Sequence, residues 1–213
     1  MKEMEACFSN ILSSSFAIVA LLTLLHLTSL TKTCSAARAL HHTNTNTQFI
    51  RTSCVATTYP RVCYNSLSAY ATDIQTSPKQ LAHTALSVTL TGAQSTSAMM
   101  SKLSARHGLR PGEVGAMRDC IENMGDSIDE LRQSLEEMDH LSGPHFDFQM
   151  SNIQTWVSAA LTDEDTCMDG FDGDAMNGKV KNIVRGQIVK MAQLTSNALA
   201  LVNNLASTQS KSP

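Results

Sequence analysis

Apolar residues recur at every third or fourth position over residues 114–138, and this pattern restricts the fold more than any other feature. The series is Val114, Met117, Ile121, Met124, Ile128, Leu131, Leu135 and Met138. That spacing places the eight side chains on one face of a helix more than three heptads long. Most of the stability of such a helix comes from packing its apolar face against other elements. The chain must therefore supply partners for it.

Three further segments show the same spacing, at residues 78–103, 147–167 and 180–205. Breaks rich in Gly or Pro separate the four, at residues 106–112, at Gly143-Pro144 and at 169–178. No segment alternates for long enough to build a sheet, and an aromatic content of 5% also argues against one. The pattern predicts an all-α, up-and-down four-helix bundle.

Two shorter helical pieces lie at residues 49–70 and meet at Tyr59-Pro60. Proline disfavours helix in the residue before it and suits the first turn of a new helix, so the chain should bend there. We expect an N-terminal helical hairpin ahead of the bundle, and a bundle domain covering residues 49–207. Residues 37–48 are expected to be flexible, and residues 208–213 form a short tail.

The first 36 residues are typical of an export signal. Residues 16–30 (FAIVALLTLLHLTSL) are apolar, but the run is short and is interrupted by His26. Small residues follow, so that a peptidase would cut after Ala36 or Ala37. The alternative is a retained membrane anchor, for which the apolar run is short. We predict a secreted protein that has no membrane association after cleavage.

Removal of the signal leaves four of the six cysteines: Cys54, Cys63, Cys120 and Cys167. An even number in an exported chain indicates disulfides, with three possible connectivities. A zinc site is the rival interpretation, but no Cys-x-x-Cys pair is present. Cys54 and Cys63 lie nine residues apart across the bend, which favours pairing them; the other two would then join neighbouring helices.

Charge is strongly segregated along the chain. Residues 38–112 carry a net charge of +6, residues 113–174 carry −14, and residues 175–213 carry +5. The acidic block argues against a nucleic-acid partner and would attract a basic protein surface. Alternatively, the opposite blocks neutralise each other when the helices pack.

Motifs for catalysis are absent from the sequence. There is no Gly-x-Ser-x-Gly elbow, His-Glu-x-x-His pair or phosphate-binding glycine loop. The histidines share no spacing, and residues 169–178 do not fit a calcium-binding loop, because Ile183 stands where a Glu is required. We expect no enzymatic activity, no cofactor and no bound metal.

Acidic residues repeat at steps of three and four along the second long segment, at Asp119, Glu122, Asp126 and Asp129. They share one helix face, rotated by about 100° from the apolar stripe. Repeated like charges weaken an isolated helix, which suggests a binding purpose. A Cys120–Cys167 bond would bring Thr166 and Asp169 close to them. The alternative is a solvated face that serves only solubility.

Four blocks of residues resemble the plant invertase/pectin methylesterase inhibitor family, and the resemblance covers residues 49–206. They are Cys54-x-x-x-x-Tyr59-Pro60-x-x-Cys63-x-x-Ser66-Leu67, Asp119-Cys120-x-Glu122-x-x-x-Asp126-x-x-Asp129-x-Leu131, Trp156-x-Ser158-Ala159-Ala160-Leu161-Thr162-x-x-x-Thr166-Cys167-x-Asp169-x-Phe171 and Ser196-Asn197-Ala198-Leu199-Ala200. The third block is more similar to methylesterase inhibitors, and to esterase pro-regions, than to invertase inhibitors. Because the chain ends at Pro213 without a catalytic domain, a stand-alone inhibitor is expected.

The resemblance implies a hairpin disulfide Cys54–Cys63 and a second bond, Cys120–Cys167, between bundle helices. It implies an apoplastic protein that binds pectin methylesterase 1:1 over its pectin-binding cleft and so regulates de-esterification of cell-wall pectin. An invertase target is the alternative. The residues implied to contact the esterase are Glu122, Asp126, Asp129, Thr166 and Asp169.

Overall fold

The structure is a computed structural model that describes residues 44–172 and 178–209. The proposed signal peptide, residues 37–43, the centre of the glycine-rich loop at 173–177 and the tail residues 210–213 lie outside the described residues. Within the described ranges, no helix combines the length and the hydropathy needed to cross a bilayer. The described helices belong to one compact unit that begins at Thr45.

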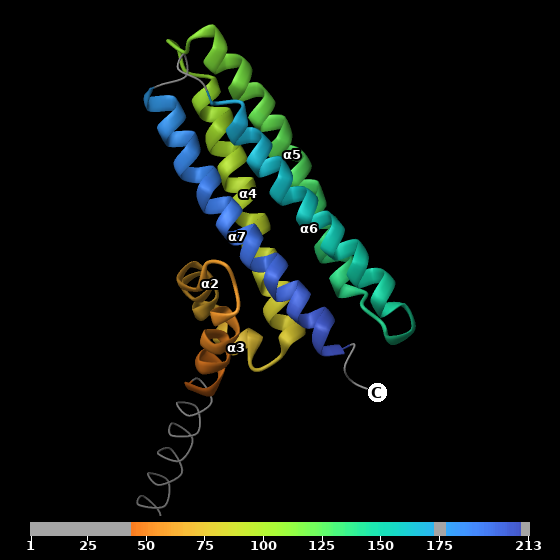
Figure 1. The fold of residues 1–213 in the computed structure, drawn as a ribbon. Helices are drawn as coiled ribbons and strands as arrows, with labels where there is room; N and C mark the ends of the chain where they lie inside the picture. Colours follow the sequence, from red (N-terminus) through yellow and green to blue (C-terminus); the bar gives the residue numbers. More distant parts are fainter. Residues whose placement is uncertain (1–43, 173–177, 210–213) are drawn as a thin grey trace, which may run out of the picture. The chain divides into compact units, whose positions relative to one another are not determined.

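Four long helices make up most of this unit (Figure 1). They are α4 (Pro78–Ser104), α5 (Pro111–Asp139), α6 (Phe146–Asp169) and α7 (Lys179–Gln209). Proline opens both α4 and α5, where its missing N–H is not needed. The side chain of Ser77 caps α4 by accepting a hydrogen bond from the backbone N–H of Gln80. The four helices predicted from periodicity are confirmed, and no strand occurs in the part that the structure describes.

The helices pack in the ring order α4, α5, α6, α7, with α7 returning to α4. This is the up-and-down bundle that the sequence predicted. Its core is rich in methionine, whose flexible side chain fills irregular space between helices. The buried methionines are Met100, Met117, Met124, Met138, Met150 and Met191. In this order, the α4–α7 pair and the α5–α6 pair form opposite sides of the bundle.

A disulfide-linked hairpin precedes the bundle. Residues 44–55 are helical, and the chain turns at Tyr59 into α2 (Pro60–Leu67), followed by a 3-10 turn, η1 (Ser68–Tyr70), and the short α3 (Ala71–Ile74). The disulfide Cys54–Cys63 joins the two arms, with a Cα–Cα distance of 5.6 Å. The predicted hairpin and its predicted bond are both present.

The first arm is longer than the sequence indicated, because residues 44–48 are helical where a flexible segment was expected. Asn46 and Ile50, one helical turn apart, are buried, and Cys54 continues that buried side. Burial of this side fixes the polar run as helix, an effect of tertiary packing that local composition does not reveal.

A side-chain amide holds the hairpin to the bundle. The Asn197 carbonyl on α7 accepts a hydrogen bond from the Tyr59 backbone N–H at 2.9 Å, and its NH₂ group donates to the Tyr59 backbone oxygen at 3.0 Å. Asn197 itself is buried. The hairpin turn is therefore bonded to a residue 138 positions away in the sequence.

Candidate functional site

The second disulfide, Cys120–Cys167, joins α5 to α6 with a Cα–Cα distance of 4.3 Å. Both cysteines are buried. The bond fixes the register between the two antiparallel helices and so determines which of their exposed residues become neighbours. It is the second pairing that the sequence predicted.

The five residues that the family resemblance indicated are all exposed on these two helices. Glu122 follows Cys120 by two positions, and Thr166 and Asp169 flank Cys167, so the disulfide brings these three to one end of the α5–α6 side. Asp126 and Asp129 continue the stripe along α5, with Asp129 about 10 Å beyond Glu122 along the helix axis. The five residues thus define what we call the acidic face.

Two members of the acidic face already have partners inside the chain. Asp129 forms an ion pair with Arg132, one turn further along α5. The Thr166 hydroxyl donates to the backbone oxygen of Thr162 at 2.8 Å. The second contact leaves the lone pairs of that hydroxyl available to accept from a partner protein.

A pair of acidic residues that sequence reasoning did not single out lies beside Asp126. Burial, followed by repulsion from Asp163 and Asp126, raises the pKa of Glu130 to about 7. Burial also raises the pKa of Asp163, while its hydrogen bond to Glu130 acts in the opposite direction. The two carboxyls come from α5 and α6, and the acidic face therefore lies over a contact between these helices at which the protonated form of Glu130 is favoured.

A second acidic residue that was missed lies inside the bundle. Glu164 on α6 is fully buried, and its Oε1 atom accepts a hydrogen bond from Thr195 Oγ1 on α7 at 2.7 Å and from Ser127 Oγ on α5 at 3.4 Å. The signal was present in the sequence: Glu164 occupies an apolar position in the series Ile153, Val157, Ala160, Glu164 and Cys167. A carboxyl at such a position marks a polar contact in the core.

The described histidine and carboxylate side chains do not assemble into a metal centre. Among residues 44–172 and 178–209, no group of three or more His, Cys, Asp or Glu side chains is arranged to hold a metal. His83 Nε2 lies 3.0 Å from Asp139 Oδ1, which links α4 to α5. His140, just after the last residue of α5, contacts the backbone oxygen of Glu136. Both histidines therefore contact helices and have a structural role.

Fold and disulfide pattern place the chain in the class of four-helix-bundle proteins with a disulfide-linked N-terminal hairpin. Residues 48–201 match the family described as plant invertase/pectin methylesterase inhibitor. The chain belongs to this family of enzyme inhibitors.

Individual relatives agree with that assignment. The chain is 55% identical over 162 residues to the "21 kDa protein" of Daucus carota, and the aligned region covers 75% of this chain and 84% of the relative. It is 49% identical over 181 residues to Pectinesterase inhibitor 11 of Arabidopsis thaliana, which covers 83% of this chain and 90% of the relative. A crystal structure of a mutant pectin methylesterase inhibitor from Arabidopsis has the same fold, with a TM-score of 0.55 at 23% identity, covering 70% of this chain and 92% of that chain.

Proposed function

We propose that this protein inhibits a pectin methylesterase by binding to it, and that it has no catalytic role of its own. The observation that carries the proposal is the 49% identity, over most of both chains, to a relative named as a pectinesterase inhibitor. The alternative, an invertase target, belongs to the same family but is not favoured by these relatives. Because inhibitors of the two enzymes share one fold, the surface residues of the bundle would determine which enzyme is bound.

The acidic face is the proposed contact surface. An esterase that binds pectin has a groove able to accept a chain of galacturonic acid units, some of them anionic. An anionic protein surface is complementary to such a groove and would occupy the place of the polysaccharide. Glu122, Asp126 and Asp169 have the carboxylates best placed for this contact, because all three are exposed and none forms an ion pair within the described residues.

Rigidity of the α5–α6 side supports this assignment. The Cys120–Cys167 bond lies at the same level along α5 and α6 as Glu122 and Thr166, so the exposed side chains are presented on two covalently linked helices. A preorganised surface gives up less conformational entropy on binding. We further propose a 1:1 complex and secretion to the apoplast, where the target enzyme acts.

Titration of the purified protein against a plant pectin methylesterase and a cell-wall invertase tests the proposal. We expect methylesterase activity to fall linearly to an endpoint at one equivalent, with invertase activity unchanged. Native electrophoresis should show a single new complex with the esterase. Loss of invertase activity with intact methylesterase activity would reject the proposal in favour of the alternative.

A further inference from the structure

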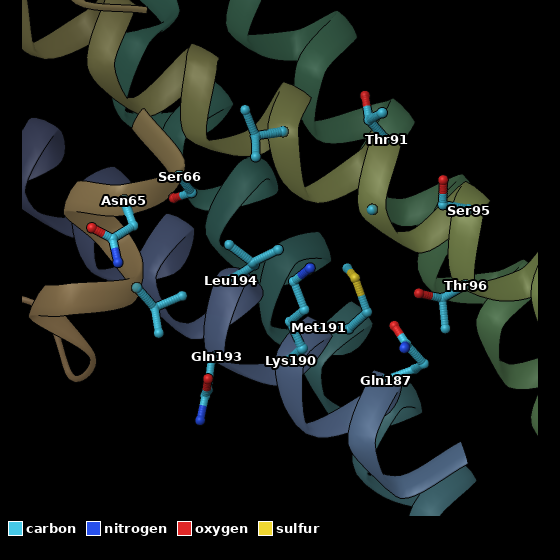
Figure 2. Close-up of a pocket in the computed structure, with 13 residues that line it drawn as sticks. Asn65, Ser66, Thr91, Ser95, Thr96, Gln187, Lys190, Met191, Gln193 and Leu194 are labelled. Carbon is cyan, nitrogen blue, oxygen red and sulfur yellow. The ribbon is translucent and has the colours of Figure 1, made fainter. Parts of the chain in front are cut away.

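The side of the bundle opposite the acidic face carries a groove. A half-open cavity of about 580 Å³ lies where α2 meets α4 and α7, and Figure 2 shows its labelled residues on these three elements. Its apolar lining includes Val62, Val88, Met191 and Leu194. At Gly92 the Met191 side chain packs closely against α4, because a Cβ there would lie 2.9 Å from Met191 Sδ.

The groove continues along the α4–α7 seam. A second cavity, of about 460 Å³, shares Ser95 with the first and extends past Met99 and Ile183 to Lys102 and Arg106. Lys102 lies ten residues beyond Gly92, or about 15 Å further along α4. Because the two cavities adjoin at Ser95, we treat them as one elongated groove, which we call the seam groove.

Polar side chains line the seam groove, and none of those from the described part of the chain is acidic. Hydroxyl groups come from Ser66, Thr91, Ser95 and Thr96, and amide groups from Asn65, Gln187 and Gln193. Three exposed cations stand along it: Lys190 near Gly92, then Lys102 and Arg106. Within residues 44–172 and 178–209, none of the three forms an ion pair.

The charge of the whole chain is distributed in the same way. The hairpin and α4 come from the basic block before residue 113, and α7 comes from the basic block after residue 174. Residues 113–174, with a net charge of −14, include α6 and nearly all of α5. Because the α4–α7 and α5–α6 pairs lie on opposite sides, the bundle has a basic side and an acidic side. Basic and acidic helices therefore do not alternate around the bundle, and the opposite charges stay on separate sides.

We propose that the seam groove binds a linear polyuronate, a polysaccharide whose repeating sugars each carry one carboxylate and several hydroxyls. The three cations would pair with carboxylates spaced along the chain. Amide side chains both donate and accept hydrogen bonds, as sugar hydroxyls do. The apolar floor would receive the less polar faces of the rings. De-esterified pectin is a polyuronate, so one molecule would hold an esterase on its acidic side and the wall polymer on its basic side; this last step rests on the proposed function.

Other polyanions fit the groove less well. A nucleic-acid strand is bound through stacking of its bases on aromatic side chains, and the residues that line the groove include none. A phosphodiester backbone or a sulfated surface offers few hydrogen-bond donors for the amide oxygens of Asn65, Gln187 and Gln193. The groove lining thus favours a ligand with both carboxylates and hydroxyls.

Retention of the purified full-length protein on immobilised polygalacturonate tests the proposal, without any esterase present. We expect retention at low salt, elution as salt screens the ion pairs, and no retention on fully methyl-esterified pectin. The variant Lys102→Gln/Arg106→Gln/Lys190→Gln should bind about tenfold more weakly, a loss of about 1.4 kcal/mol, since exposed ion pairs each contribute little.

The matched control Arg61→Gln/Lys179→Gln/Arg185→Gln removes three exposed cations that do not line the groove. It should retain near wild-type binding. Equal weakening by the two triple variants, equal retention on esterified pectin, or equal retention on immobilised DNA would each overturn the proposal.

Native electrophoresis with the esterase, in the absence of polysaccharide, keeps the two proposals separate. The groove variant should form that complex as the wild type does. Loss of the complex would show that the groove is not an independent site, and would overturn the inference.

Discussion

Glu164 on α6 and Thr195 on α7 share a hydrogen bond of 2.7 Å in the core of the bundle, with the hydroxyl as donor. The other carboxyl oxygen, Oε2, is buried and has no hydrogen-bond partner among the described residues. Burial is the main reason that the pKa of Glu164 rises to about 8, and nearby Asp165 and Asp163 raise it slightly, while the hydrogen bonds from Thr195 and Ser127 lower it. At neutral pH the group is therefore mostly protonated, which agrees with its position in an apolar core.

Stability is consequently expected to fall as pH rises from about 4.5 to about 8. Over that range the unfolded chain releases the Glu164 proton and the folded chain keeps it, so each step upward in pH favours the unfolded state. The loss between pH 4.5 and 7 should be roughly 3 kcal/mol, measured by urea unfolding at several pH values. Glu130 contributes in the same direction.

The variant Glu164→Gln, which resembles the protonated form, should remove most of this pH dependence. Glu136→Gln, an exposed carboxylate on α5, is the control and should leave the slope unchanged. A Glu164→Gln protein with the wild-type slope would show that another group is responsible.

The two disulfides should contribute unequally to stability. On the chain-entropy model, the bond Cys120–Cys167, which spans 47 residues, stabilises by about 4 kcal/mol, and Cys54–Cys63, which spans nine, by about 2.7. Replacing each pair by alanine and comparing the free energies of unfolding in urea checks this. Each double variant serves as the control for the other, and a larger loss from the hairpin pair would contradict the expectation.

Asn197 should control how firmly the hairpin is held. The substitution Asn197→Ala removes both hydrogen bonds to the Tyr59 backbone, and each unsatisfied group costs about 1–3 kcal/mol. We expect hydrogen exchange to accelerate in residues 60–67 while the amides of α5 stay protected.

Asn203→Ala is the matched control for Asn197→Ala. It lies on the same helix and loses one exposed hydrogen bond, from Gln154. Uniform acceleration of exchange across all helices in Asn197→Ala would indicate global destabilisation, and would contradict a local role.

The sequence predicted the four bundle helices because the spacing of apolar residues along each segment indicates which side chains are buried. That spacing can be recognised within each segment alone. Proline and glycine marked the ends, and the number of cysteines restricted the disulfides. Contacts between distant polar residues are different, because no local pattern connects Tyr59 to Asn197 or Glu130 to Asp163. The seam groove also could not be predicted from the sequence, since its lining depends on how α2 packs on α4 and α7.

The acidic face gives the most direct test of how the esterase is bound. The double variant Glu122→Gln/Asp126→Asn removes two exposed charges beside the Cys120–Cys167 bond and leaves the core intact. We expect inhibition of the methylesterase to weaken at least about tenfold, since charge contacts across an interface contribute both to binding energy and to the association rate.

The control for this pair is Glu136→Gln/Asp147→Asn, which removes the same charge from exposed positions at the opposite end of α5 and α6. It should inhibit almost as well as the wild type, because its substitutions lie about 15 Å or more along the helices from Asp126. The association rate of the Glu122→Gln/Asp126→Asn protein should also depend less on salt than that of the wild type, since screening acts on fewer charges. If both double variants weakened inhibition equally, net charge would be the cause. The esterase would then have to contact a different surface of the bundle.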